Sequence, residues 1–429
     1  MKMLKLNKSK EYLRKATGLI PALSQTFSKA PYSYVNGVYP VYLKGGKGSH
    51  VIDVDNNEFI DYVLALGPIT LGYSYPAVDR AILKQLKNGI SFSMPHYLEV
   101  ELSEKIHDII PGAEMVRFSK TGSDAVTAAV RAARALTKKD KILYCGSGGV
   151  WHDWFTVITS RNEGIPSVMK KMIRKFNYND IESLKIAFEE WKDQIATVCM
   201  EPVMLDKPKR EFLESVKKIT HDNNSVLIFD EVVTGFRYAN GGAQEYLGIE
   251  ADIVAFGKGI ANGMPLGAIT GKSQYMQKFD DVFYSTSYGG ETLSLAAGIA
   301  VINEFENKAV IKHCWKIGTE FMNEFNKIAA EIGLDMEIIG FPIRGSIVCR
   351  DKDGNPSNLL KSIFLQECIE RGIMFGPGAV FVSFSHTSKD IKTTLNVCEQ
   401  SMKILKKGIE TGSLSSLLRG DEMKQVITF

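Results

Sequence analysis

The stretch IVAFGKGIANGMPLGA, residues 253–268, leads an apolar run directly into a lysine between two glycines. Residues 253–256 have the composition of a buried strand, and Lys258 stands where that strand would end. Because lysine prefers water, a solvated strand end is the simplest interpretation of this residue. Its meaning depends on which other polar side chains the chain brings to the same place.

Outside this stretch, short apolar runs alternate with helical patterns from about residue 75 to residue 300. The runs cover residues 116–119, 141–145, 195–201, 225–231 and 252–257. Such alternation predicts a mainly parallel sheet with helices on both faces, an α/β architecture. Two strands around the turn at residues 55–57, an amphipathic segment at 309–333 and short strands near 344–350 and 379–385 lie outside that core.

These patterns predict three parts with soft boundaries. We expect an N-terminal segment (residues 1–65) that packs with the small domain, a large α/β domain (66–318), and a small C-terminal α+β domain (319–429). We find no internal repeat and no low-complexity linker.

Composition narrows the class of protein. The chain has 429 residues, of which 45% are hydrophobic and 24% are charged, with a net charge of +3. Near-neutrality argues against a nucleic-acid-binding protein. Six scattered cysteines without Cys-x-x-Cys spacing suggest neither a metal site nor disulfides and fit a reducing cytoplasm. No apolar run reaches the roughly 18 residues of a membrane span, and the lysine-interrupted start does not resemble a signal peptide.

A second candidate feature is Thr121-Gly122-Ser123, where the run 116–119 gives way to an alanine-rich helical pattern. Free backbone N–H groups at a helix start, a glycine that allows close approach and two hydroxyls can hold a phosphate. The same residues also fit a plain capping box, with Thr121 as the N-cap and Asp124 three positions later. Both interpretations stay open at this point.

A third feature is the pair Asp230 and Glu231 at the end of the run 225–231. Adjacent strand residues point to opposite faces, so only one of these carboxylates can face a given cleft. That carboxylate can hold a proton on a ring nitrogen, bind a metal or bind a ribose hydroxyl. Metal is the weakest option, because no further Asp, Glu or His stands nearby at a convincing ligand spacing. A solvated acidic pair is the alternative.

Taken together, the three features predict a specific ligand. Open parallel sheets bind ligands at the carboxyl ends of their strands, where Lys258 would share a crevice with Asp230 and the cradle at residues 121–123. A buried lysine has a lowered pKa and can attack an aldehyde as a neutral amine. An amine for a carbonyl, an acid for a ring nitrogen and a cradle for a phosphate fit pyridoxal 5′-phosphate.

The chain also resembles a known family. Residues 230–237 (DEVVTGFR) and 251–271 (ADIVAFGKGIANGMPLGAITG) are similar to the signature of the class III, fold-type I aminotransferases, and the resemblance covers nearly the whole chain. Residues 53–78, 122–142 and 380–395 resemble segments of the glutamate-1-semialdehyde 2,1-aminomutases within it. The resemblance implies a fold-type I PLP-dependent transferase, with a large, mainly parallel α/β domain and a smaller α+β domain.

The resemblance also implies a role for individual residues. Lys258 would form the Schiff base with the cofactor and then move the proton during amino transfer. Asp230 would keep the pyridine nitrogen protonated, and Val232, on the same strand face, would pack against the ring. Residues 121–123 would hold the phosphate, and Ser287 from a neighbouring subunit would complete the site. An obligate homodimer with active sites at the subunit interface follows from that arrangement.

Two departures from the family pattern stand out. The family has a Tyr-His-Gly whose aromatic ring stacks on the cofactor, whereas this chain has Ser147 and Gly148 there and one extra residue. Trp151 is our candidate for the stacking residue, and a place in the core is the alternative. At residues 289–291 the chain has Gly-Gly-Glu where Gly-Asn-Pro is commoner, which puts Glu291 near the rim of the site without an assigned role.

The catalytic residues do not separate a transaminase from a mutase, because both reactions use the same lysine. Ser383 stands where many glutamate-dependent transaminases have an arginine, as in mutase-like members, but residues 19–34 lack the Ser-Pro-Val-Arg expected of the mutase. We therefore predict an aminotransferase acting on a small-molecule amino donor, with glutamate as one candidate, and an aldehyde or ketone acceptor, sugar-derived carbonyls included. Glutamate-1-semialdehyde 2,1-aminomutase is the alternative.

Two further classes are less consistent with the sequence. A Rossmann-type dinucleotide binder would need a Gly-x-Gly-x-x-Gly turn in a βαβ unit, which the chain lacks. A catalytically inactive cofactor-binding scaffold is conceivable, but every polar role predicted above is filled.

Overall fold

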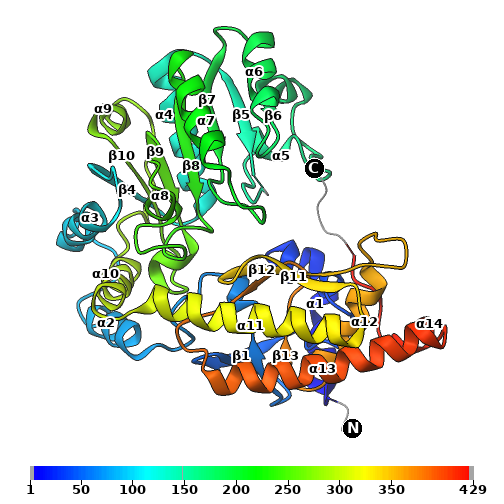
Figure 1. Cartoon of the computed structure of the whole chain (residues 1–429). Helices are drawn as coiled ribbons and strands as arrows, with labels where there is room; N and C mark the ends of the chain where they lie inside the picture. Colours follow the sequence, from blue (N-terminus) through cyan, green and yellow to red (C-terminus); the bar gives the residue numbers. More distant parts are fainter. Residues whose placement is uncertain (1–3, 147, 425–429) are drawn as a thin grey trace. The chain divides into compact units, whose positions relative to one another are not determined.

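The structure is a computed structural model that describes residues 4–146 and 148–424 (Figure 1). This part of the chain forms two compact units, which we describe separately. The central unit is Pro76–Ile311, and the terminal unit joins the residues up to Tyr75 with those from Lys312 onward. These boundaries differ from the expected ones at 65/66 and 318/319. The N-terminal boundary lies later because Thr70 and Tyr73 hydrogen-bond through their backbones to Phe384 and Gly48 of the terminal unit.

The central unit contains a sheet with the strand order β4-β10-β9-β8-β7-β5-β6. Its strands are β4 (Met115–Ser119), β5 (Lys141–Cys145), β6 (Ile173–Lys175), β7 (Ile195–Met200), β8 (Val226–Glu231), β9 (Ile253–Phe256) and β10 (Gly267–Gly271). The strands from β9 to β6 are parallel, which confirms the predicted architecture. Strand β10, which the sequence analysis missed, runs antiparallel to both of its neighbours.

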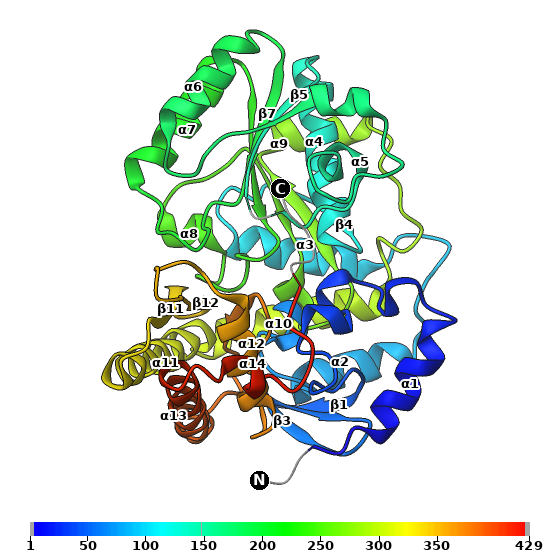
Figure 2. The same ribbon diagram turned by 90° about the vertical axis from the view of Figure 1, so that its right-hand side faces the viewer.

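Helices cover both faces of this sheet. Figure 2 shows α4 on one side of β7 and the pair α6 and α7 on the other. The helices are α2 (Pro76–Leu86), α3 (Tyr97–Ile109), α4 (Gly122–Thr137), α5 (Asp153–Thr156), α6 (Ile181–Glu190), α7 (Arg210–Asp222), α8 (Ala243–Leu247), α9 (Ser273–Met276) and α10 (Thr292–Asn307), with 3₁₀ turns η5 (Ser167–Met172), η6 (Lys258–Ala261) and η7 (Gln277–Asp280). The buried face of α4 is mostly alanine, including Ala125, Ala129 and Ala132. Such small side chains let the helix axis approach the strands closely.

The terminal unit contains two smaller sheets, with strand orders β1-β2-β3-β13 and β11-β12-β14. Its strands are β1 (Leu43–Lys47), β2 (His50–Asp53), β3 (Glu58–Asp61), β11 (Met336–Phe341), β12 (Arg344–Cys349), β13 (Ile373–Met374) and β14 (Ala379–Phe381). Strands β2 and β3 form the antiparallel pair predicted around residues 55–57. Strand β14 is shorter than predicted, and the residues after it form local bonds instead, such as that from the backbone N–H of Ser383 to His386 Nδ1 (3.1 Å).

Two long helices lie side by side in the terminal unit, α11 and α13, as both views show (Figures 1 and 2). The helices are α1 (Asn7–Thr17), α11 (Val310–Ile332), α12 (Asn358–Ile369), α13 (Ser388–Glu410) and α14 (Leu414–Leu417), with 3₁₀ turns η1 (Pro21–Leu23), η2 (Phe27–Lys29), η3 (Pro31–Ser33) and η4 (Leu64–Leu66). Tyr62, Phe321 and Phe375 stack in the core with ring centroids 5.0–6.1 Å apart. Within the described ranges, none of the helices has the length and apolar character needed to cross a bilayer.

Candidate active site

The parallel pairing of β8 and β9 places two of the predicted residues on neighbouring strands. Asp230 pairs with Ala255 and Glu231 with Phe256, so Lys258 follows only two residues beyond the end of the shared ladder. Asp230 is buried, with 7% of its surface exposed, and Lys258 is half-buried. The strand ends therefore bring a carboxylate and an amine to the same edge of the sheet, as the sequence predicted.

Glu231 serves a structural purpose on the opposite face of β8. Its carboxylate accepts hydrogen bonds from the backbone N–H of Ala243 (2.6 Å) and Gln244 (2.9 Å), which begin helix α8, and from Thr234 Oγ1 (2.9 Å). Burial raises the pKa of Glu231 to about 7, against the lowering effect of these bonds. Asp230, on the other face of β8, accepts from the backbone N–H of Val232 (3.1 Å) and is the member of the acidic pair at the same sheet edge as Lys258.

The backbone at Lys258 is in an unusual conformation. Its φ is +41°, in the left-handed region that side chains other than glycine seldom adopt. Residues held in this region cost free energy and concentrate at functional sites. A 3₁₀ turn, η6, begins at Lys258, and the residue is half-buried, which distinguishes it from an ordinary solvated strand end.

The start of α4 meets the same strand ends. A methyl group on Gly122 would lie 2.5 Å from Val232 Cγ1, and one on Gly257 would lie 3.3 Å from both Val232 Cγ1 and Gly122 Cα. Both glycines are therefore needed for close packing between the helix start and the ends of β8 and β9. This contact brings the cradle at residues 121–123 beside Val232 and the residue preceding Lys258.

The capping box predicted at Thr121 is present. Thr121 Oγ1 accepts from the backbone N–H of Asp124 (3.1 Å), and Asp124 Oδ2 accepts from the backbone N–H of Thr121 (2.9 Å). Among the described residues, no group accepts a hydrogen bond from the backbone N–H of Gly122 or Ser123. Capping and anion binding are therefore compatible here, because the cap leaves two N–H groups at the positive end of the helix dipole.

The Ser123 hydroxyl is used to hold the loop that contains Gly149 and Trp151, so it is not available to a phosphate. Its Oγ donates to the carbonyl of Gly149 (3.2 Å) and accepts from the backbone N–H of Trp151 (3.3 Å). Because a hydroxyl has one proton, Ser123 can give a phosphate its backbone N–H but has no second O–H to donate. The sequence analysis did not foresee this use of the side chain.

Trp151 lies on the surface of the central unit. Its side chain is 68% exposed, so the alternative interpretation as a core residue is wrong; Trp154, 5% exposed, takes the core position. The Trp151 ring packs edge-on against His152, with ring centroids 4.3 Å apart. Thr127 of α4 fixes the loop further by bonding to His152 Nδ1 and Trp154 Nε1. Ser147, where the family tyrosine would stand, lies outside the described residues.

Glu291 has a clear structural role that the sequence analysis could not assign. It caps α10 by accepting from the backbone N–H of Leu293 (2.6 Å) and Ser294 (3.3 Å), and it forms an ion pair with Lys120 Nζ (3.0 Å). Burial raises the pKa of Glu291, but the hydrogen bonds from Ser294 and Lys120 outweigh it and leave the pKa below its ordinary value. Glu291 thus ties the loop before α10 to the residue that precedes Thr121.

Ser287 lies on that same loop and is exposed. Tyr288, 64% exposed, and Phe283, 84% exposed, also lie there. The loop is anchored by Arg117, which donates to the Tyr284 carbonyl, and by Arg131, which donates to the Phe283 carbonyl (both 2.6 Å). Ser287 makes no hydrogen bond within the described part of the chain, so the structure does not join it to the other predicted site residues.

Two further buried groups near Asp230 were missed. Tyr144 is the penultimate residue of β5 and Glu201 follows β7. A methyl group on Gly146 would lie 2.7 Å from Tyr144 Oη and 3.1 Å from Glu201 Oε1. Burial, together with the charges of Asp230 and Glu201, raises the pKa of Tyr144 well above its ordinary value. The signal was available for Glu201, since it is the charged residue directly after the mostly apolar run that forms β7.

Comparison with known proteins identifies the family. The family model "Aminotransferase class-III" matches residues 32–400. This chain belongs to the class III aminotransferases. It is therefore an enzyme that uses pyridoxal phosphate, and a buried acid, a strand-end lysine and a helix start with free N–H groups fit the ring nitrogen, aldehyde and phosphate of that cofactor.

Individual relatives of this class III aminotransferase differ in their named reactions. It is 34% identical over 413 residues to a 3-aminobutyryl-CoA aminotransferase of Cloacimonas acidaminovorans (94% of this chain and 99% of the relative). It is 33% identical over 432 residues to a glutamate-1-semialdehyde 2,1-aminomutase of Methanococcoides burtonii (94% and 100%). A solved transaminase with PLP bound superposes with a TM-score of 0.88 at 26% identity (95% and 100%).

Proposed function

We propose that this class III aminotransferase moves an amino group between an amino acid, with glutamate as one candidate donor, and an aldehyde or ketone acceptor, sugar-derived carbonyls included. The observation that carries the proposal is the adjacency of Asp230 and Lys258 on β8 and β9 beside the start of α4. Bound pyridoxal phosphate supplies an aldehyde for amines and a protonated ring that withdraws electrons. We take Pro76–Ile311 as the cofactor-binding domain, since all of these groups lie in it.

Each site residue then has a specific task. Lys258 would hold the cofactor through its ε-amine and would move a proton to and from the substrate α-carbon. Asp230 keeps the proton on the ring nitrogen, a task that its burial strengthens by excluding water. Val232 packs against the ring face, and Trp151 covers the face that the missing family tyrosine would cover. The backbone N–H groups at residues 121–123 bind the phosphate.

A homodimer with active sites at the interface is part of the proposal. Exposed apolar side chains gather on α2, α3 and the loop between them. Helix α10, which follows the loop that carries Ser287, bonds to this region through the backbone N–H of Thr292, which donates to the Ile90 carbonyl (3.0 Å). These side chains are Leu83, Leu86, Ile90, Phe92, Met94, Tyr97 and Val100. Burial of such a patch by a second copy would remove it from water. Ser287 would then reach the phosphate of the neighbouring subunit.

Absorbance tests the cofactor reaction. We expect cofactor-loaded protein to absorb in the visible range and the band to shift when an amino donor is added without acceptor. Screening acceptors against the aminated form identifies the substrate. Because one relative is named for 3-aminobutyryl-CoA, the screen includes β-amino acyl thioesters. Absence of any band after incubation with pyridoxal phosphate would contradict the proposal.

A cytoplasmic location is also part of the proposal. All six cysteines are free thiols and are buried, which supports a reducing compartment.

The aminomutase is the second candidate. Several relatives at 31–34% identity carry that name, which is the observation in its favour. Ser383 does not decide the matter, because it is fully buried and bonded to His386 Nδ1 (2.9 Å) rather than presented to a substrate. Incubation with glutamate 1-semialdehyde alone separates the two reactions. Isomerisation without any second substrate would overturn the transaminase assignment.

A further inference from the structure

Two side chains of α4, one helical turn apart, hold the loop that carries Trp151. Ser123 Oγ accepts from the backbone N–H of Trp151 (3.3 Å), and Thr127 Oγ1 bonds to His152 Nδ1 (2.6 Å). Residues four apart in a helix lie on the same face, so both bonds come from the side of α4 that meets the loop. The helix start that forms the cradle at residues 121–123 therefore also fixes this loop.

The hydrogen bonds of Thr127 define which ring nitrogen of His152 carries the proton. The indole N–H of Trp154 can only donate, so Thr127 Oγ1 accepts from it (2.8 Å). Within the described residues, the other partner of the Thr127 hydroxyl is His152 Nδ1. The hydroxyl proton is satisfied when Nδ1 accepts it. The proton of the neutral imidazole is then on Nε2.

The second ring nitrogen of His152 faces an acid. His152 Nε2 lies 3.5 Å from Asp124 Oδ1, and Asp124 Oδ2 accepts from the backbone N–H of Thr121 (2.9 Å). Burial lowers the pKa of His152, whereas the charge of Asp124 raises it. Arg131 lowers this pKa further and Asp153 raises it, and the result is below the ordinary value. His152 is therefore neutral at neutral pH, as its bond from Thr127 requires.

His152 also supports the Trp151 ring. The two ring centroids are 4.3 Å apart with an angle of 70° between the planes, an edge-on contact. The Trp151 residue is 68% exposed, whereas the His152 side chain is only 23% exposed. Holding a large exposed ring in one orientation costs conformational entropy. A fixed imidazole beside the indole restricts its rotation and lowers that cost.

We propose that His152 is a positioning residue that orients Trp151 toward the bound cofactor. Thr127 and Asp124 hold the imidazole from two sides, and the imidazole holds the indole. The inference rests on the proposed function, because the cover that Trp151 gives to the cofactor ring is part of it. It adds a residue that acts through Trp151 rather than on the cofactor itself.

Visible circular dichroism of the cofactor-loaded protein tests this role. Pyridoxal phosphate is not chiral, so its absorption band has a circular-dichroism signal only through fixed, asymmetric surroundings. We expect Trp151→Ala and His152→Ala each to reduce the signal per bound cofactor. The affinity for pyridoxal phosphate, measured by equilibrium dialysis, should fall about 2–10-fold in each, the range that one aromatic contact supplies.

The double variant decides whether His152 acts through Trp151. If it does, the variant with both substitutions should match Trp151→Ala alone in signal and in affinity. Additive losses, or an unchanged signal in His152→Ala, would refute the proposal. An unchanged signal in Trp151→Ala would also refute it, while the absorbance shift with an amino donor would still support the proposed amino transfer. Absence of any cofactor band from the unaltered protein would instead contradict the proposed function.

A pair of substitutions at Thr127 tests the hydrogen bond separately. Thr127→Val removes the hydroxyl at similar volume and should reduce the signal as His152→Ala does. Thr127→Ser keeps the hydroxyl and should preserve the signal. Equal signals in these two variants would refute the proposed chain of contacts. Should His152→Ala fail to fold, the Thr127 pair in the presence and absence of Trp151→Ala still decides.

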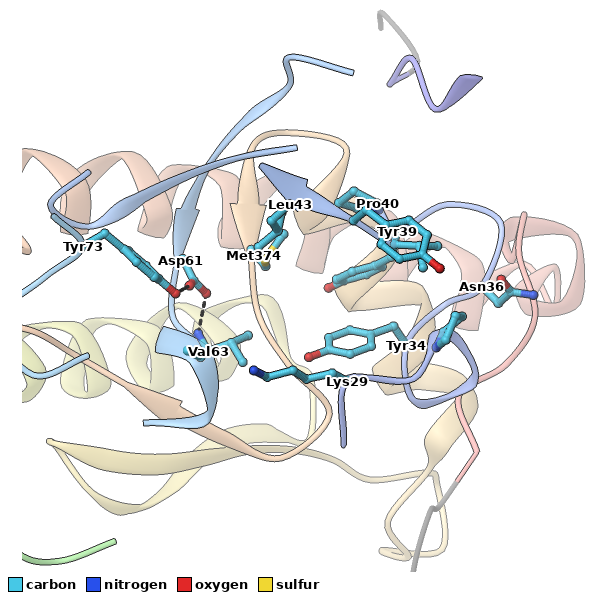
Figure 3. Close-up of a pocket in the computed structure, with 14 residues that line it drawn as sticks. Lys29, Tyr34, Asn36, Tyr39, Pro40, Leu43, Asp61, Val63, Tyr73 and Met374 are labelled. Atoms are coloured by element: carbon cyan, nitrogen blue, oxygen red, sulfur yellow. Dashed lines mark hydrogen bonds between the residues drawn. The ribbon is translucent and has the colours of Figure 1, made fainter. Parts of the chain in front are cut away.

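Tyr73→Phe controls for a general loss of stability. Figure 3 shows the Tyr73 hydroxyl beside Asp61 in the terminal unit, where it donates at 2.6 Å. Loss of this bond should lower the melting temperature but leave the signal per bound cofactor unchanged. A loss of signal as large as that of His152→Ala would show that stability alone controls the signal, which would overturn the proposal.

Discussion

In the central unit, Asp230 and Glu231 are neighbours in one strand and are both buried. The Glu231 carboxylate accepts from the two backbone N–H groups that begin α8, whereas Asp230 Oδ1 accepts from the backbone N–H of Val232. In the terminal unit, His386 is fully buried, and its bonded or charged neighbours include Ser383, Asp390 and His313. The first arrangement places one carboxylate at the sheet edge that Lys258 shares and the other under a helix start. The second places an ionisable group in the interior of the terminal unit. Burial alone therefore does not identify a functional residue; its position at the ends of the parallel strands does.

The largest expected effect separates the two adjacent carboxylates. Asp230→Asn should lower kcat by about 10²–10⁴-fold and shift the cofactor absorbance, because the ring nitrogen loses its acid partner. Glu231→Gln should leave the absorbance unchanged and reduce the free energy of unfolding by about 1–3 kcal/mol, since its amide cannot accept all three donors. Steady-state kinetics and denaturant titrations measure both. Similar kinetic losses in the two variants would refute the assignment of opposite faces.

The next effect concerns acid stability of the terminal unit. Burial lowers the pKa of His386 to about 4, although Asp390 opposes the shift; His50 and His313 add to it. The unfolded chain therefore binds a proton that the folded chain refuses, so the contribution is complete above pH 6.5 and is lost as the pH falls toward 4. A pKa difference of about 2.5 corresponds to about 3 kcal/mol. In His386→Gln, the free energy of unfolding should therefore fall less between pH 6.5 and pH 4 than in the unaltered protein, as denaturant titrations at several pH values would measure.

Glu231 should show the opposite pH dependence in the central unit. Its folded pKa of about 7 lies above the ordinary 4.5, mainly through burial, with a smaller contribution from Asp230. The folded chain then keeps a proton that the unfolded chain releases, so stability is complete below pH 4.5 and is lost as the pH rises toward 7. Glu231→Gln should therefore change the slope in the opposite sense to His386→Gln. If the two substitutions changed the pH dependence of the unfolding free energy in the same direction, the assigned pKa shift of Glu231 or of His386 would be wrong.

A smaller effect tests the packing at the cofactor cradle. Gly122→Ala should reduce the free energy of unfolding by about 1–3 kcal/mol, because the new methyl group overlaps Val232. Combining it with Val232→Ala should recover part of that loss, while Val232→Ala alone should not stabilise the protein. Thermal unfolding of the three variants measures the coupling. Additive losses would mean that the two side chains do not meet.

The smallest expected effect concerns Ser123. Ser123→Ala should reduce stability by about 1 kcal/mol and increase hydrogen exchange in residues 149–155, because the loop loses its two bonds to the hydroxyl. The affinity for pyridoxal phosphate should change by less than about tenfold, since the backbone N–H groups remain. Thr121→Ala, which removes a helix cap, is the matched control for stability. A much larger loss of cofactor affinity would show that the hydroxyl itself binds the phosphate.

The sequence was most informative where function depends on residues at consecutive strand ends. Asp230 and Lys258 follow apolar runs that the chain itself delimits, and the parallel alternation was enough to place them at one edge. Strand β10 was missed because glycine and proline stand directly before it and glycine begins and ends it. Glu291 was not assigned because glutamate is an unusual helix cap, and its partner Lys120 is 171 residues away.

The terminal unit could not be predicted to the same depth. Its central contacts join residues that are distant in sequence, such as Ser49 with Asp390 and Asn36 with Asp421. No local pattern indicates such a pairing, because each partner separately looks like an ordinary surface residue.

The most direct test of the central claim is borohydride reduction of cofactor-saturated protein followed by peptide mapping. The account predicts that the pyridoxyl label is found on the ε-amine of Lys258, and that Lys258→Ala carries none although it folds. Recovery of Lys258 unlabelled from protein that is saturated with the cofactor would contradict the account.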